Sequence, residues 1–213
     1  MSGHGALMDS VYRHQRFIYD LTRKYYLFGR DRMIRELDLA PGESLIEVGC
    51  GTARNLIAIA RRYPGAALYG LDASQEMLKT AAGKVEQAGL TDRIRLAHGY
   101  AEALSPALFG LEQPFSRVLF SYSLSMIPDW KQSLKSASSC LARDGRLHVV
   151  DFGDLDGLTW PAKPLLLAWL RLFHVSPRAD LLREFETKGC GTLSLLPGRY
   201  AFLAAASREI FLN

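Results

Sequence analysis

Short apolar runs and longer amphipathic stretches alternate along most of the chain. The apolar runs have the five or six residues of a buried strand, and between them apolar residues recur every three or four positions, as on one face of a helix. Strands and helices in alternation are typical of a parallel sheet covered on both faces. The predicted strands cover 44–49, 67–72, 94–98, 117–121 and 146–151, and the predicted helices between them cover 54–62, 75–88 and 130–141.

The C-terminal part departs from this alternation. After a predicted helix at 179–188, the apolar runs 192–196 and 200–206 flank the turn Pro197-Gly198-Arg199, which predicts an antiparallel hairpin. We therefore expect an α/β three-layer sandwich with a mostly parallel, seven-stranded sheet that closes on an antiparallel pair.

Two segments lie outside both patterns. Across 9–35, apolar residues share one helical face and basic residues occupy another, which predicts a helix that lies on an anionic membrane surface or packs on the sheet as a lid. One helix could do both, because a lid over a lipid substrate would lie at the membrane surface. The connection 164–173 is unusually apolar and too short to span a bilayer, so it predicts a core helix, an acyl-chain groove or an interfacial wedge.

Charge is concentrated at the front of the chain. Residues 1–35 hold seven bases and three acids, whereas the remainder holds nineteen of each, so the net charge of +4 belongs to the first segment. We expect a basic N-terminal part at 1–38 and one folded domain at 39–213. With 213 residues, of which 48% are hydrophobic, the chain can bury a substantial core.

The cysteines and the N-terminus bear on location. Three widely spaced cysteines form neither a disulfide framework nor a zinc-binding pattern, and the first residues lack a basic start followed by an apolar core. We expect a cytoplasmic protein without metal or transmembrane segment, associated with the inner face of the membrane through its basic front.

The run from Ser44 to Thr52 carries the clearest chemistry. An apolar strand ends on Glu47 and then turns through Gly49 and Gly51, and glycines there let the backbone approach a ligand closely. A dinucleotide-binding motif has a third glycine where this chain has Arg54. The pattern therefore favours a ligand that contains a nucleoside over a dinucleotide with its pyrophosphate. The next predicted strand ends on Asp72, at the spacing expected of a carboxylate that binds ribose hydroxyls.

Together, these two motifs resemble those of the class I S-adenosylmethionine-dependent methyltransferases. The matching residues are Glu-x-Gly-x-Gly-Thr at 47–52, followed by Gly70, Asp72, Ser74, Met77 and Leu78. The resemblance implies a Rossmann-like fold with S-adenosylmethionine as cofactor, and S-adenosylhomocysteine as product. It also implies that Gly49 and Gly51 face the methionine part, that Glu47 lies beneath it and that Asp72 binds the ribose.

The front segment is similar to a narrower family, the bacterial diacylglycerylhomoserine N-methyltransferases of betaine-lipid synthesis, which are related to phosphatidylethanolamine N-methyltransferases. The similarity lies in Tyr12–Arg23 and in Phe28-Gly29-Arg30-Asp31. It implies three methylations of a homoserine lipid amine, Tyr19 covering the cofactor, and Arg30 meeting a carboxylate of the cofactor or of the head group. The residues expected to line the cofactor site are Tyr19, Arg30, Glu47, Gly49, Cys50, Gly51, Asp72, Ala73, Met77, Tyr100, Ala101, Glu102 and Ser121.

Acceptor chemistry points to tyrosines. Methyl transfer from a sulfonium requires that the acceptor is positioned and that water is excluded, and it needs no nucleophilic residue. As methyl groups accumulate on an amine it becomes a quaternary ammonium, which aromatic faces attract. We expect Tyr122, in the loop after the fourth strand, to orient the acceptor, with Tyr12 and Tyr26 contributing from the front segment. The family's usual acid for the adenine is replaced by Tyr100, which leaves the backbone of Tyr100 and Ala101 or the Glu102 side chain for that contact.

The motifs are compatible with other functions as well. The acceptor is alternatively phosphatidylethanolamine or a small soluble metabolite, and a protein that binds the cofactor without turnover is also compatible with the motifs. The basic front also fits an RNA methyltransferase. However, its charges are interleaved with apolar positions and no Asn-Pro-Pro-Tyr motif follows the fourth strand, so we expect no nucleic-acid partner. The lipid acceptor at an anionic membrane is the leading hypothesis.

Overall fold

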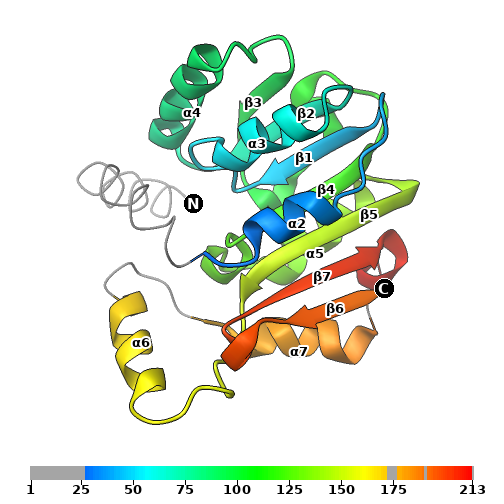
Figure 1. Cartoon of the computed structure of the whole chain (residues 1–213). Coiled ribbons are helices and arrows are strands. Elements are labelled where there is room, and N and C mark those ends of the chain that lie inside the picture. The colour runs from blue at the N-terminus through cyan, green and yellow to red at the C-terminus, as the bar shows by residue number, and fades with distance from the viewer. Residues whose placement is uncertain (1–26, 172–176, 190, 213) are drawn as a thin grey trace.

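A single seven-stranded sheet organises the protein (Figure 1). The computed structural model describes residues 27–171, 177–189 and 191–212. The strands lie in the order β3-β2-β1-β4-β5-β7-β6. Their bounds are β1 Ser44–Val48, β2 Ala67–Asp72, β3 Ile94–His98, β4 Phe115–Ser121, β5 Leu141–Phe152, β6 Thr192–Leu195 and β7 Ala201–Ser207.

The pairing confirms the expected mixture of parallel and antiparallel strands. Strands β1 to β5 pair in parallel, and β7 pairs antiparallel with both β5 and β6. The chain order reverses between β1 and β4, so the loops after these two strands diverge at their carboxyl ends. That point of divergence is where open α/β sheets bind ligands.

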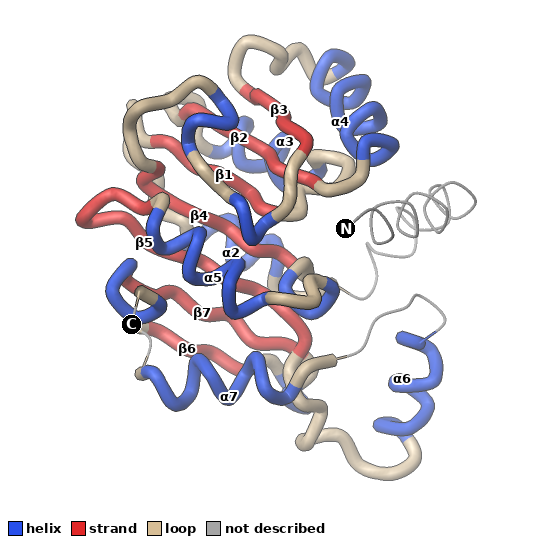
Figure 2. Tube along the Cα trace, turned by 180° about the vertical axis from the view of Figure 1, so that it is seen from behind, coloured by secondary structure: helices blue, strands red, loops and turns tan. Residues whose placement is uncertain are grey.

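Helices cover both faces of the sheet, as the views from front and back show (Figures 1 and 2). Their bounds are α2 Arg30–Glu36, α3 Arg54–Arg62, α4 Gln75–Gln87, α5 Trp130–Ser139, α6 Ala162–Arg171 and α7 Ala179–Lys188. Helices α2, α3 and α4 lie on one face, and α5 and α7 lie on the other. The α/β sandwich expected from the sequence is therefore confirmed.

Strand alternation explains how one sheet supports two cores. Leu45 of β1 and Leu68 of β2 belong to the core beneath α2, α3 and α4, whereas Ile46 and Val48 belong to the core on the α5 and α7 side. All four side chains are almost fully buried. Because successive residues of β1 pack on opposite faces, its register is fixed, and so is the position of the glycine turn at its end.

Helix α6 leaves the layered arrangement. It follows the carboxyl end of β5 and lies at that end of the sheet, away from the two helical layers (Figures 1 and 2). Leu170 of this helix is fully buried, and Leu166 and Trp169 pack against the core. The predicted apolar connection is thus a helix, beginning two residues earlier than expected.

The front segment differs from the prediction of one helix that continues to Arg35. Residues 1–26 lie outside the described part, and α2 begins only at Arg30, after a turn at Gly29 with φ of 85°. A Cβ on Gly29 would come within 3.0 to 3.3 Å of Leu203, Leu196 and Val150, so the close approach to the sheet requires glycine. Phe28 is 57% exposed instead of continuing an apolar helical face.

Candidate active site

The turn after β1 folds back against the end of β2. Gly49 has φ of 74°, and the amides of Gly49 and Cys50 both donate hydrogen bonds to the Leu71 carbonyl, at 2.8 and 3.0 Å. A Cβ on Gly49 would lie 2.6 Å from the Cβ of Ser123, which follows β4. The Ser123 hydroxyl donates to the Val48 carbonyl at 2.8 Å. Glycine at 49 therefore lets the ends of β1 and β4 meet.

Asp72 joins the glycine turn to the next helix. One carboxylate oxygen accepts the Gly51 amide at 2.7 Å, and the other accepts the Ser74 amide at 2.9 Å. Ser74 in turn caps α4 by accepting the Met77 amide at 3.3 Å. These contacts fix the carboxylate at the strand end, where it can receive a diol.

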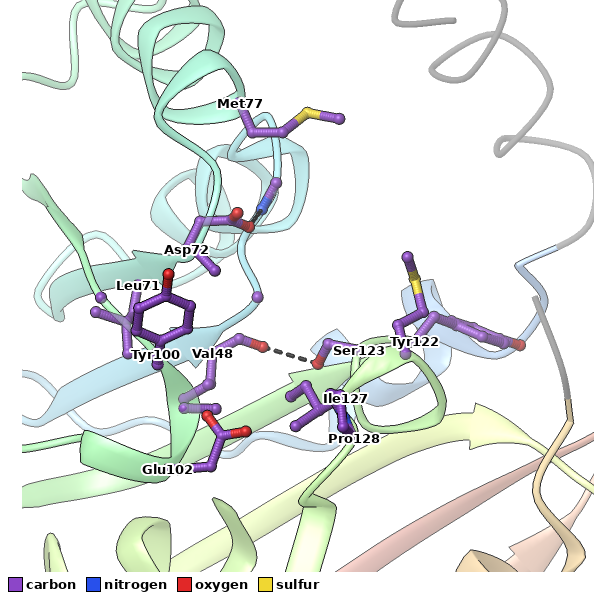
Figure 3. A pocket seen from close by; sticks show the side chains of 16 residues that line it. Val48, Leu71, Asp72, Met77, Tyr100, Glu102, Tyr122, Ser123, Ile127 and Pro128 are labelled. Atoms are coloured by element: carbon purple, nitrogen blue, oxygen red, sulfur yellow. Dashed lines mark hydrogen bonds between the residues drawn. The ribbon is translucent and has the colours of Figure 1, made fainter. Parts of the chain in front are cut away.

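A pocket opens over these strand ends (Figure 3). Its lining combines the glycine turn, the end of β2, the segment after β3 and the loop after β4. The predicted site residues that line it are Gly49, Gly51, Asp72, Ala73, Met77, Tyr100, Ala101, Glu102 and Tyr122. Sequence reasoning missed Ser123, Met126, Ile127 and Pro128, which complete the wall on the β4 side. Their signal was their position directly after a strand that ends at this edge.

A smaller hollow lies on the other side of the Gly49 turn. It is bordered by the predicted residues Arg30, Glu47, Cys50 and Ser121, and shares Gly49 with the first pocket. Arg30 is 7% exposed and donates from Nε to the Leu27 carbonyl at 3.2 Å. The Ser121 hydroxyl is buried, with no hydrogen-bond partner among the described residues. A cation and a hydroxyl at this place fit the amino-acid end of S-adenosylmethionine.

Asn55 is a site residue that sequence reasoning missed. It lies in the first turn of α3, borders the smaller hollow and donates from Nδ2 to Glu47 Oε1 at 2.7 Å. The sequence feature that could have indicated Asn55 is its side-chain amide in the first turn of the helix that follows the glycine turn. Asn55 thus holds the Glu47 carboxylate at the smaller hollow, and the contact of Glu47 with the methionine part of the cofactor stays a prediction.

Cys50 is unsuited to nucleophilic chemistry. Its thiol is buried, and burial, followed by the charges of Asp72 and Glu47, raises its pKa well above the ordinary value. A thiol in this state stays protonated at neutral pH. Its place in the hollow is therefore one of contact rather than covalent catalysis.

Tyr122 occupies an unexpected position for a residue that orients the acceptor. It is 1% exposed and has φ of 55°, and its ring lies 4.7 Å from that of Phe152. Its hydroxyl donates to the Phe28 carbonyl at 2.5 Å, and Figure 3 shows the ring pointing away from the other labelled lining residues. The structure thus ties the pocket wall to the segment before α2, and the acceptor role of Tyr122 stays a prediction.

Asp151, at the end of β5, holds the loop after β4 in place. It is fully buried and accepts the Ser125 amide at 3.1 Å and the Phe152 amide at 2.8 Å. Burial raises the pKa of this carboxyl to about 6, although the hydrogen bonds oppose the shift. The loop after β4 is therefore fixed from two sides, by Asp151 and by Tyr122.

The remaining predictions concern the tyrosines of the front segment, metal binding and membrane-spanning helices. Tyr12, Tyr19 and Tyr26 lie outside the described residues. Within the described ranges, no cluster of three or more His, Cys, Asp or Glu side chains is suited to a metal ion. None of the described helices combines the length and the apolar character needed to cross a bilayer.

Comparison with known proteins identifies the class that this site defines. Residues 45–145 match a model described as a methyltransferase domain. The ubiquinone/menaquinone biosynthesis C-methyltransferase of Syntrophotalea carbinolica is 30% identical over 75% of this chain and 65% of its own length. The demethylmenaquinone methyltransferase of Corynebacterium efficiens is 32% identical over 89% of this chain and 73% of its own. A structure of a SAM-dependent methyltransferase from Aquifex aeolicus covers 86% of this chain and 92% of its own, with a TM-score of 0.61 and 15% identity.

The chain belongs to the class I S-adenosylmethionine-dependent methyltransferases. Its cofactor is S-adenosylmethionine, as in the other members of this class. The chain spans only 65%, 57% and 54% of the lengths of three curated relatives that it matches. The relatives are named for quinone methylation and not for lipid amine methylation, so the closeness to betaine-lipid enzymes expected from the front segment finds no support in these comparisons.

Substituting Gly49 by alanine tests how the turn forms the cofactor site. The added Cβ combines positive-φ strain with overlap on Ser123, so we expect a loss of about 3 kcal/mol in unfolding free energy and at least about tenfold weaker binding of S-adenosylhomocysteine. Denaturant titration and calorimetry measure the two quantities.

The matched control is Gly42→Ala. Gly42 has a similar φ of 86°, but an added Cβ meets nothing within 4 Å, so the variant carries the strain alone. We expect it to lose about 1 kcal/mol and to keep its affinity. Equal effects of the two substitutions on affinity would contradict the assigned role of Gly49.

Proposed function

We propose that this enzyme methylates the primary amine of a lipid head group, with diacylglycerylhomoserine as the acceptor, in three successive transfers to the betaine lipid. The proposal combines the cofactor site with the similarity carried by Phe28-Gly29-Arg30-Asp31. The observation that supports a lipid acceptor is the exposed apolar surface of α6, because an enzyme with a soluble acceptor would not need such a surface.

That surface is apolar. Trp160, just before α6, is 85% exposed, and Leu165 is 66% exposed. The other exposed residues here are Pro161, Ala162, Pro164 and Ala168, and the half-buried Lys163 is paired with Asp156 at 2.6 Å. Exposed tryptophan and leucine beside an ion pair whose charges cancel are suited to the interfacial region of a bilayer.

The position of α6 supports the same conclusion. The helix lies at the carboxyl end of the sheet, which is also the edge where the cofactor pocket opens (Figures 1 and 2). A protein resting on a bilayer by α6 presents that edge to lipid head groups. The seven bases of residues 1–35 would add attraction to an anionic surface.

The reaction itself asks the protein for positioning. The bound cofactor supplies a methyl group on a sulfonium, and the amine must be neutral and in line to receive it. Met126, Ile127 and Pro128 form an apolar wall on the pocket's β4 side, which excludes water. Arg178 Nε reaches the Ser125 carbonyl at 3.2 Å, which puts a cation next to this wall, where a head-group carboxylate can pair with it.

Quinone C-methylation is the second candidate. It rests on the names of two relatives, a ubiquinone/menaquinone biosynthesis C-methyltransferase and a demethylmenaquinone methyltransferase. Phosphatidylethanolamine remains a third acceptor, since it offers the same primary amine without the carboxylate.

One assay separates the three acceptors. The purified chain, labelled S-adenosylmethionine and anionic vesicles are combined with diacylglycerylhomoserine, phosphatidylethanolamine or demethylmenaquinone in parallel. We expect label in the homoserine lipid, with mass spectrometry detecting one, two and finally three added methyl groups. Label confined to the quinone, or to phosphatidylethanolamine, would replace the proposed acceptor by that one.

The role of α6 has its own test. We expect the double substitution Trp160→Ser and Leu165→Ser to reduce turnover on vesicles at least about tenfold, because it removes most of the interfacial apolar area. Binding of S-adenosylhomocysteine should stay unchanged. Leu108→Ser is the matched control and should keep full activity on vesicles, because the 45% exposed Leu108 lies in the short helix Pro106–Phe109 that follows β3, the edge strand opposite β6. Equal turnover in the double variant and the wild type would rule out the interfacial role.

A further inference from the structure

A second cavity lies on the α2 face of the sheet, separate from the cofactor site. It has a volume of about 530 Å³ and is lined by α2 and the two residues after it, by Arg117 of β4, by the middle of β5, and by strands β6 and β7. None of its lining residues borders either cofactor hollow. We propose that this cavity binds an oxyanion, a phosphate or carboxylate group, between Arg146 and His148.

The strand register explains why the cavity exists. Arg146 and His148 are two residues apart on β5, so both side chains lie on the α2 face. His148 pairs with Ala205 of β7, which pairs in turn with Thr192 of β6. These small neighbours leave a space beside the imidazole that larger side chains would fill.

His148 is the buried polar group that calls for a ligand. It is 3% exposed, and neither ring nitrogen has a hydrogen-bond partner within the described part of the chain. Buried polar atoms are nearly always hydrogen-bonded, so an imidazole that lines a cavity without a partner indicates a missing acceptor or donor. An oxyanion accepts from a ring N–H, and a protonated phosphate can also donate to the second ring nitrogen.

The charge around His148 favours an anion over a cation. Burial, followed by the charges of Arg117 and Arg146, lowers the pKa of His148 to about 4. The positive potential of these guanidiniums is therefore felt at the imidazole, and no carboxylate outweighs it. A bound anion would oppose this potential and raise the pKa of the imidazole.

The other charged groups facing the cavity are largely engaged. Arg117 donates to the carbonyls of Leu37 and Asp38 and pairs with Glu43 at 3.2 Å. Arg32 pairs with Glu36 at 2.7 Å and donates to the Ser194 hydroxyl at 3.2 Å.

The Arg146 side chain, by contrast, is exposed and makes no hydrogen bond or ion pair among the described residues. Asp38 contributes the remaining carboxylate at the rim. Arg146 thus has its planar fork free for two oxygens of one anion, and His148 supplies a third contact from the cavity floor.

The test follows the ring signals of His148 by NMR. Inorganic phosphate is titrated at constant ionic strength into the full chain saturated with S-adenosylhomocysteine, so that the cofactor site is filled. We expect a saturable, one-site shift of these signals and a rise in the pKa of His148. A shift that grows linearly without saturation, or no shift, would overturn the proposal.

Two arginine variants distinguish a built site from general surface charge. We expect Arg146→Met to weaken phosphate binding about tenfold, whereas Arg143→Met, at an exposed arginine of the same strand, should leave it unchanged. Equal weakening by both variants would mean nonspecific attraction and would overturn the site. Both positions are exposed, so both variants should fold, which thermal unfolding verifies.

The source of the oxyanion is decided by comparing free phosphate with phosphate on a lipid. Flotation with vesicles containing phosphatidic acid, against neutral phosphatidylcholine vesicles, is measured for the wild type and Arg146→Met. Flotation that depends on Arg146 assigns the site to a lipid head group, and flotation that does not depend on it assigns the site to a free anion. Both outcomes presuppose the saturable NMR shift.

Discussion

The hydrogen bond from the Gly51 amide to the Asp72 carboxylate holds the candidate active site together. It joins the turn after β1 to the end of β2 at 2.7 Å, while the second carboxylate oxygen holds Ser74 and with it the start of α4. The carboxylate is thus oriented before any ligand arrives. Because a preorganised acceptor loses little freedom on binding, this arrangement favours a diol-bearing ligand at this place.

The sheet determines what can gather around that carboxylate. Strand order reverses between β1 and β4, and the two strands meet closely only because position 49 has no Cβ. The cofactor's side of the site is therefore built from the rigid strand ends. The other side of the pocket comes from the loop after β4, held by Asp151 and Tyr122, and it is where we propose that the acceptor binds. This division matches how methyltransferases of one fold serve different acceptors, since the site rather than the fold sets the function.

Much of the fold was predictable because its pattern is local. The bounds of β2, β3, α3 and α7 agree with the sequence prediction, since each is an uninterrupted periodic run between turn residues. Strand β5 begins at Leu141 rather than 146 because its residues 142–145 lie at a register shift opposite β4, where Asp144-Gly145 gives a turn signal inside a strand. The break before α2 was not predicted, because the cause is the contact of Gly29 with residues far along the chain.

The cofactor side of the site was also predictable, since its residues stand within two short motifs. The acceptor side was not. The direction of the Tyr122 side chain depends on its backbone conformation and on the Phe28 carbonyl, neither of which the sequence pattern records. Asn55 was missed because its role depends on the hydrogen bond to Glu47, which lies eight residues earlier on another element. The cavity beside His148 depends on the pairing of three strands and has no sequence signal at all.

The most direct measurement of the central claim is calorimetric binding of S-adenosylhomocysteine to Asp72→Asn, with the exposed Asp92→Asn as the matched control. If the Asp72 carboxylate organises the turn and receives the ribose, the first variant should bind about a hundredfold more weakly, because charge-assisted hydrogen bonds are lost on both sides of the carboxylate. The control should bind like the wild type. Wild-type affinity in Asp72→Asn would contradict the account.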